Sequence, residues 1–431
     1  MLPSSSVELF PTPSVPPSPG MLPELSTLDI RLFQYYVEKL SSRLANADGL
    51  WNPLRVLVIP RMCSSIVLFH AACAGSALHM ARFSSEDVER YDRLARLHYV
   101  QALSALKNLI PTLNQAQAAT DKSMLNLDEI ALLASIFLCK YEIIKDGMSI
   151  WRHHLDGVET LYTFLASKYR GSRHDTIEFA HNFLTYHKSI ASLTTEVTED
   201  SDEAWEEAPA PSSNEMSSID LYMGCSRSLF VLLLRVMRLR KLCDRVCSRY
   251  SHVKSEVESI LVVLSRQQWR LEHFNIPEDM TFGTAEGLQH VAQAFESCLL
   301  VCLHSIIEDS AQSSRDADPG SYWEEISHML PTSKQEALQA CIREIDLVPM
   351  DGSVEAGLLP LLFVVACESH DFDESLAAIQ RVDRLGSNIG IGNQCYAGVL
   401  VREIWTHRLQ HHEGSWRDFL KTSDWKNIIL T

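Results

Sequence analysis

Two pairs of cysteines have a spacing that a metal site on helices would need. Cys243 and Cys247 lie one helical turn apart, as do Cys298 and Cys302, so each pair falls on one face of a helix. Four thiolates from two facing helices could bind zinc. Both pairs lie among leucines and valines, however, and this setting favours buried structural cysteines over metal ligands.

Histidines near carboxylates are the next candidates for chemistry. The Glu-x-x-His spacing occurs twice, but di-iron carboxylate helices need two further glutamates. Two other histidines lie one turn apart without a third ligand, which is typical of an exposed helix end. These patterns are Glu178/His181, Glu325/His328 and His407/His411.

Motifs with an established catalytic mechanism are absent from the sequence. It contains no Gly-x-Ser-x-Gly elbow, no P-loop and no His-Glu-x-x-His motif. Residues 386–392 hold three glycines, but a helical pattern precedes them, so a helix-to-helix connection is expected in place of a dinucleotide-binding loop. We therefore predict that the chain is not an enzyme and that it holds no cofactor of its own.

The charge of the chain argues against direct contact with nucleic acid. The 38 Lys and Arg face 55 Asp and Glu, which gives a formal net charge of −17. Binding to DNA requires a basic footprint that displaces counterions from phosphates. One basic stretch could be a nuclear import signal or a phosphate-facing patch, but apolar residues of the same helix predict a solvated basic face. Its members are Arg235, Arg238, Arg240, Lys241, Arg245, Arg249 and Lys254.

The sequence predicts neither a membrane segment nor a secretory signal. The longest apolar runs, 298–307 and 356–367, are shorter than the roughly 20 residues that a spanning helix needs. The N-terminal residues lack a basic segment followed by an apolar one. The 11 scattered cysteines then indicate a reducing compartment, where free cysteines pack as small apolar residues.

The elements that would position these side chains are predicted to be helices, because helical periodicity is the main pattern in the sequence. Apolar residues repeat every three or four positions over 127–146, with Asn126 and Glu129 as a capping box. A short turn at Asp146-Gly147 leads to a second helix that starts near Trp151, so the two helices should pack antiparallel. The same signal recurs at 28–45, 62–82, 86–109, 221–250, 253–272, 285–308, 333–345, 371–385 and 394–410. We predict an all-α fold, an array of antiparallel helical hairpins without significant β-sheet.

Two segments interrupt the helical pattern and set the predicted organisation. Residues 1–27 are rich in Pro and Ser and should form a disordered linker. Residues 195–220 carry nine acids and two prolines, so we expect a flexible acidic loop, with an acidic activation segment as the alternative. The helical region is thereby divided into an N-terminal half, 28–194, and a C-terminal half, 221–431.

An ordered series of segments resembles the regulatory region of fungal-specific transcription factors, which carry a zinc binuclear cluster as their DNA-binding module. The block 141–157 resembles the most recognisable signature of the family. The other matching segments are 32–36, 51–54, 59–60, 70–79, 360–368, 393–405, 416–420 and 424–425. The family-motif positions are Asp146, Gly147, Trp151, His154, Gly157, Pro360, Asn393, Trp405 and Trp416.

These positions are expected to act in packing and not in chemistry. Asp146-Gly147 makes the turn, Trp151 anchors the hairpin, and Gly157 allows close approach of a neighbouring helix. No catalytic, metal-binding or DNA-binding residue is predicted among them.

The resemblance implies a helical regulatory domain of a transcription regulator in the nucleus, with the cytoplasm as the alternative. Its expected partners are the transcription machinery or another transcription factor, together with an apolar small-molecule effector or a second copy of the chain. The six-cysteine cluster is missing, since no cysteine precedes Cys63; zinc is expected only if an N-terminal extension carries that cluster. The alternatives are a DNA-free adaptor that pairs with an intact relative and, less favoured, a helical enzyme.

Overall fold

The computed structural model describes residues 25–50, 52–84, 87–115, 122–148, 150–195, 219–243, 246–266, 280–313, 320–350, 352, 354–411, 415–425 and 427–431. Within these ranges the regular structure is helical, and the one β-type pairing is an isolated bridge between Asp220 and Cys225. The predicted all-α fold is confirmed. The predicted linker and acidic loop lie almost entirely outside the described residues.

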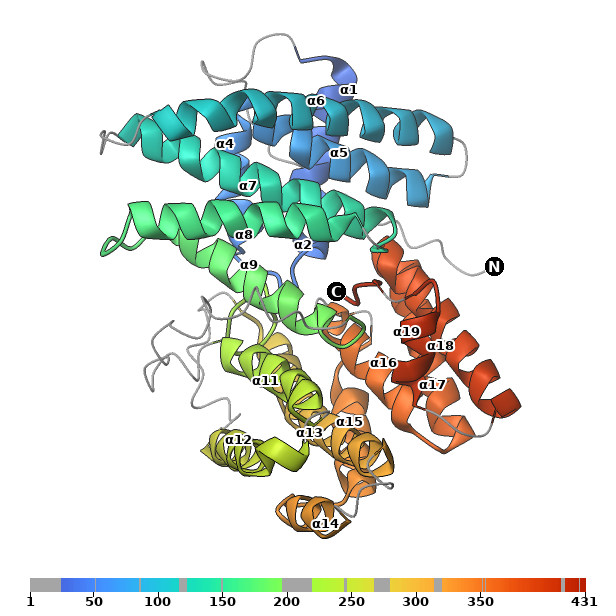
Figure 1. The fold of residues 1–431 in the computed structure, drawn as a ribbon. Coiled ribbons are helices and arrows are strands. Elements are labelled where there is room, and N and C mark those ends of the chain that lie inside the picture. Colours follow the sequence, from blue (N-terminus) through green and yellow to red (C-terminus); the bar gives the residue numbers. More distant parts are fainter. Residues whose placement is uncertain are drawn as a thin grey trace, which may run out of the picture.

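A first group of helices forms a stack of long antiparallel neighbours (Figure 1). Helix α5 packs against both α6 and α7, and α7 packs against α8. The group comprises α1 Thr27–Tyr35, η1 Tyr36–Leu40, α2 Ser41–Arg43, α3 Pro53–Val56, α4 Val58–Met62, α5 Ile66–Phe83, α6 Val88–Gln115, α7 Lys122–Lys145, α8 Trp151–Lys168 and α9 Asp175–Ala191.

Two further groups lie on one side of this stack (Figure 1). In the second group, α13 packs against α11 and α15; in the third, α17 packs against α16 and α18. The second group comprises α11 Arg227–Cys243, α12 Val246–Arg266, α13 Phe282–Ser313, α14 Gly320–His328 and α15 Lys334–Leu347. The third comprises η4 Glu355–Leu358, α16 Leu359–Glu368, α17 Phe372–Ile389, α18 Gly392–His411 and α19 Trp416–Thr422.

Two helix boundaries differ from the sequence-based expectation. Helix α7 already begins at Lys122, so Asn126 lies inside it, and the predicted capping box is wrong because the carboxylate of Glu129 binds Arg61 at 2.5 Å. The predicted helices 221–250 and 253–272 are also wrong at their junction. Helix α12 runs without interruption from Val246 to Arg266, across the predicted junction, because it turns an apolar face, with Val253 and Val257 buried, into the core.

Two helices are long and apolar enough to cross a membrane by length and composition alone. They are α5 and the part of α13 that spans Phe282–Gln312. Within the fold, 78% and 72% of their most apolar stretches are buried, as expected for helices at the centre of a protein core. The uniform apolarity of both helices therefore follows from burial on all sides.

Candidate functional site

The turn between α7 and α8 has the geometry that its sequence predicts. Gly147 adopts a left-handed conformation with φ +67°, which glycine tolerates without steric cost. Its amide donates to the Glu142 carbonyl at 2.9 Å, and the Met148 amide donates to Asp146 Oδ1 at 3.0 Å. The turn-forming role of Asp146 and Gly147 is confirmed.

The last residues of the chain dock onto this turn. The Ile429 amide donates to the Gly147 carbonyl at 2.9 Å, and the Trp151 indole donates to the Asn427 carbonyl at 3.0 Å. The Asn393 side-chain amide donates to the Ile429 carbonyl at 2.9 Å and to the Thr431 carbonyl at 2.6 Å. Three family-motif positions, Gly147, Trp151 and Asn393, thus converge on one segment, 427–431, which we call the tail.

His154 takes part in a contact between α8 and α6. Its Nε2 shares a hydrogen bond of 2.8 Å with the Tyr99 hydroxyl, and the Tyr99 ring stacks on Tyr141. Burial lowers the pKa of His154. The described residues contain no group of three or more His, Cys, Asp or Glu that could hold a metal, so the geometry assigns His154 a packing role.

The expected role of Gly157 is wrong. A Cβ added at Gly157 would meet no heavy atom within 4 Å, and the residue is exposed on α8. No helix approaches closely there, because α8 turns its Trp151–Leu155–Val158 stripe, and not this face, towards the core.

Replacing Gly157 by alanine is therefore expected to stabilise the protein by about 0.5 to 1 kcal/mol, because glycine inside a helix costs conformational entropy on folding. Urea unfolding of Gly157→Ala against the wild type measures the difference. A destabilised variant would contradict the open environment of this residue.

The connection between α17 and α18 is wedged against the first group of helices. Gly390 adopts φ +76°, and a Cβ there would overlap the Phe83 ring; a Cβ at Gly392 would overlap the Lys145 carbonyl. The Nε2–H of His79 donates to the Ile389 carbonyl at 2.7 Å, which leaves Nδ1 to accept from the Tyr35 hydroxyl. The glycine-rich segment 386–392 is thus a helix-to-helix connection, as predicted.

The first and third groups of helices and the segment that leads into the second group meet at one place, which we call the junction. It comprises residues 43–47 after α2, Lys140 and Ile143 of α7, residues 219–226 before α11, residues 389–394 and the tail. Backbone hydrogen bonds join its first and third segments, from Asn46 to the Tyr222 carbonyl at 3.1 Å and from Ala47 to the Leu221 carbonyl at 2.9 Å. The C-terminus in Figure 1 marks this place.

The junction encloses a small chamber around the ammonium group of Lys140. The chamber has a volume of about 10 Å³, and its walls include Arg43, Tyr186, Tyr222 and Gln394. Lys140 Nζ lies 4.9 Å from the centre of the Tyr222 ring and donates a long hydrogen bond of 3.4 Å to the Leu44 carbonyl. Burial lowers the pKa of Lys140 to about 7.

A larger cavity of about 370 Å³ lies next to this chamber, and Arg43 lines both. The other residues that line it are Gly352, Glu355, Arg384, Asn388 and Ile389. Its walls are mainly polar, unlike the apolar effector pocket expected from the sequence. The volume falls within the range of small-molecule sites.

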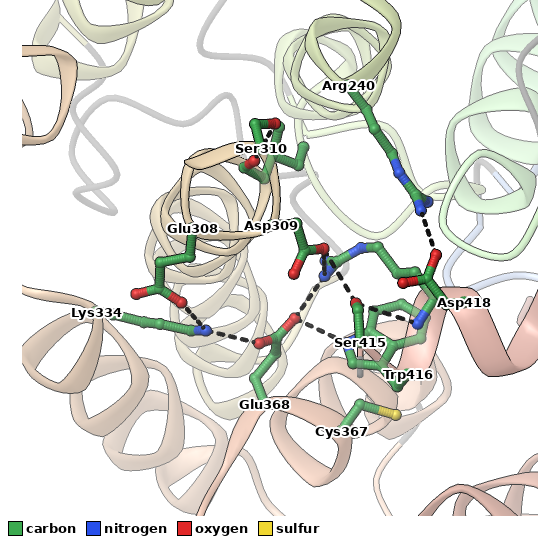
Figure 2. A network of polar contacts seen from close by, with 12 residues as sticks. Arg240, Glu308, Asp309, Ser310, Lys334, Cys367, Glu368, Ser415, Trp416 and Asp418 are labelled. Atoms are coloured by element: carbon green, nitrogen blue, oxygen red, sulfur yellow. Dashed lines mark hydrogen bonds and ion pairs between the residues drawn. The ribbon is translucent and has the colours of Figure 1, made fainter. Parts of the chain in front are cut away.

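A second polar centre, around Glu368, holds α19 onto α13 and α16 (Figure 2). Glu368 is buried at the end of α16, and its carboxylate accepts from Lys334 at 3.0 Å and from Arg417 at 2.9 Å. The Trp416 indole donates to the same carboxylate at 2.8 Å. Burial alone would raise the pKa of Glu368, but Arg417 and Lys334 lower it to about 2.

The remaining family-motif positions lie on α16 or on the helices that pack against it. Pro360 occupies the first turn of α16, where a proline costs no hydrogen bond. The Trp405 indole donates to the Ala366 carbonyl at 2.8 Å, and the Trp416 ring packs edge-on against Phe363. The positions from the C-terminal half thus fix α18 and α19 on α16.

Three residues of the basic stretch of α11 and α12 lie against carboxylates. Arg235 binds Glu256 at 2.8 Å, and Lys254 binds Glu325 of α14 at 2.6 Å. Arg240 lies 3.6 Å from Asp418 of α19. The solvated basic face predicted from the sequence is in part a set of contacts between helices; Arg245 and Arg249 lie among residues whose side chains the structure does not describe.

The cysteine pairs do not assemble a four-thiolate site within the described residues. Cys243, Cys298 and Cys302 are buried, and no metal-binding group is found among the described side chains. The side chain of Cys247 lies outside the described part. Burial in the apolar core is the setting that the sequence favours for these residues.

Sequence reasoning missed the two charged residues at the centres of the polar clusters, Lys140 and Glu368. A charged residue next to an apolar run is the signal that could have found them, since Lys140 follows Phe137-Leu138-Cys139 and Glu368 follows the apolar run 361–367. Their partners lie in other segments of the chain, and a single sequence does not show these contacts.

Comparison with known proteins gives one match. A family model described as fungal specific transcription factor domain matches residues 31–429. No curated protein and no solved structure matches the chain.

Proposed function

The chain belongs to the fungal-specific transcription factor domain family, and we propose that it senses a small-molecule effector in the nucleus and thereby controls a metabolic gene cluster. In this proposal the chain does not read DNA itself. It acts on the transcription machinery or on another transcription factor.

The observation that carries the proposal is the position of the two cavities. Their walls come from α2, α7 and α9 of the first group, from η4, α17 and α18 of the third group, and from the tail; Tyr222 belongs to the segment that leads into the second group. A ligand bound there would contact the first and third groups at once. Binding would therefore favour one packing of the groups over another, which is how a ligand shifts the state of a regulatory protein.

Charge supports the view that DNA is read elsewhere. The net charge of −17 opposes binding to phosphates. The described basic residues of α11 and α12 named above lie against carboxylates of neighbouring helices. A DNA-binding module would then come from a fusion partner or from a second protein.

We expect the purified chain to show no sequence-selective binding to duplex DNA, whereas a fusion to a heterologous zinc-cluster module should bind its site and change reporter transcription. A gel-shift assay and a reporter assay in a fungal host measure these two outcomes. A selective shift by the chain alone would overturn the proposal. A silent fusion, combined with co-purification of an intact zinc-cluster factor, would favour the adaptor alternative.

A further inference from the structure

Three cations line the two cavities without a carboxylate partner among the described residues. They are Lys140 in the chamber, Arg43 between the chamber and the cavity, and Arg384 in the cavity wall. Within the described part of the chain none of the three forms an ion pair, although the sequence has 17 more acidic than basic residues. The carboxylates in the walls bind other groups: Glu355 accepts from Arg381 at 3.0 Å, and the terminal carboxylate of Thr431 accepts from the Asn393 amide at 2.6 Å.

Lys140 is the most costly of these cations to bury. Its side chain lies among the rings of Phe183 and Tyr222, and the carbonyl of Leu44, at 3.4 Å, is its hydrogen-bond acceptor. An ammonium group buried without a counter-charge loses its hydration and gains little in return. A bound anion would supply the missing counter-charge.

Unpaired polar atoms in the chamber wall include the buried hydroxyl of Tyr222 and the buried Oε1 of Gln394. Buried polar groups of folded proteins are nearly always paired. The Tyr222 hydroxyl can donate to an oxygen of an anion, whereas the Oε1 of Gln394 is an acceptor and needs a donor.

The larger cavity adds a second cationic end. Arg384 lines it and has a buried Nε without a partner. The one carboxylate in its wall, Glu355, accepts from Arg381 at 3.0 Å. The cationic residues of the two spaces are thus Arg384 in the cavity, Lys140 in the chamber and Arg43 in the walls of both.

We propose that the junction binds a small organic dicarboxylate, with one carboxylate held by Lys140, Arg43 and Tyr222 and the other by Arg384. This ligand is the effector of the proposed function, on which the inference rests. Because the chamber itself holds about one water-sized group, one carboxylate oxygen enters it and the body of the acid occupies the cavity.

The test is calorimetric titration of the purified chain with glutarate and adipate, alongside dimethyl adipate, inorganic phosphate and chloride. We expect a dicarboxylate to bind the wild type and to bind Lys140→Met about 10- to 100-fold more weakly, the loss typical of a charge-assisted hydrogen bond. Arg384→Gln should weaken binding of the dicarboxylate but not of acetate, a monocarboxylate that is titrated alongside. Lys145→Met is the matched control, because Lys145 is half-exposed on the same helix and binds Glu142 at 3.3 Å.

A second measurement keeps the proposal falsifiable if folding is affected. Lys140→Met should unfold at the same or a higher urea concentration than the wild type, because methionine removes a buried charge that has no carboxylate partner. Equal binding of dicarboxylates to Lys140→Met, binding of phosphate or dimethyl adipate in their place, or no binding at all would overturn the site. If the zinc-cluster fusion changes reporter transcription but the chain binds no dicarboxylate, this inference is wrong and the proposed function is unaffected.

Discussion

Replacing Glu368 by glutamine is expected to lower the free energy of unfolding by about 3 kcal/mol, the lower end of the range for removing one partner of a buried ion pair. The Arg417 guanidinium would stay buried beside a neutral amide, and its next carboxylate, Asp309, lies 3.7 Å away. Lys334 would keep Glu308 at 2.7 Å. Urea unfolding followed by tryptophan fluorescence measures the loss, since Trp416 contacts Glu368 directly.

The matched control is Glu325→Gln, the same substitution in the exposed Lys254–Glu325 pair. Exposed pairs contribute little because water and salt screen them, so this variant should differ from the wild type much less than Glu368→Gln does. Equal effects of the two substitutions would contradict the importance of burial at Glu368.

The difference in unfolding free energy between the wild type and Glu368→Gln should depend on pH. Glu368 has a folded pKa of about 2, against an ordinary value of 4.5. Ionised Glu368 therefore contributes about 3 kcal/mol to the free energy of unfolding above pH 4.5. This contribution is lost as the pH falls towards 2. Burial raises the pKa of Asp309 and opposes this loss in both proteins. The free energy of unfolding of the wild type should approach that of Glu368→Gln as the pH falls through this window. A difference that stays constant with pH would contradict the lowered pKa of Glu368.

Replacing Gly147 by alanine is the second change with a large expected effect, a loss of about 3 kcal/mol. A left-handed backbone costs a non-glycine residue about 1 to 2 kcal/mol. The new Cβ would also lie 2.7 Å from the Cβ of Asn393, and overpacking of this kind costs about 1 to 3 kcal/mol. Asn393 cannot move away freely, because its amide holds the tail.

Gly157→Ala serves as the internal comparison, because it is the same substitution ten positions later and should have the opposite sign. Hydrogen exchange at the Ile429 amide, which donates to the Gly147 carbonyl, gives a local readout. Faster exchange in Gly147→Ala alone is expected. Unchanged exchange, or equal stability of the two alanine variants, would contradict the tight packing at Gly147.

The parts of the fold that follow from local sequence were predictable. The hairpin of α7 and α8 is one such part, because two amphipathic helical patterns follow each other directly in the sequence and are separated by a glycine turn. Helix α16 was not predicted from periodicity, because all ten of its residues are buried and such a helix has no polar face. The break between α11 and α12 was misplaced for a related reason, since apolar spacing continues across it.

The candidate site also has a part that was predictable from the sequence and a part that was not. Gly147, Trp151 and Asn393 were found through the resemblance, but their convergence on the tail depends on contacts between residues 276 and 36 positions apart. Lys140 and Arg417 owe their roles to what surrounds them in space. Composition and spacing describe each helix well and give little information on which helices meet.

The docking of the tail also sets an order of events during synthesis on the ribosome. The acceptor of the Trp151 indole, Asn427, lies 276 residues further along the chain, which at about 5 to 20 residues per second takes about 14 to 55 s to translate. Throughout that interval the first group of helices exists without the tail bound to Gly147 and Trp151. The chamber around Lys140, whose wall includes Thr431 of the tail, can therefore close only after residues 427–431 have been made.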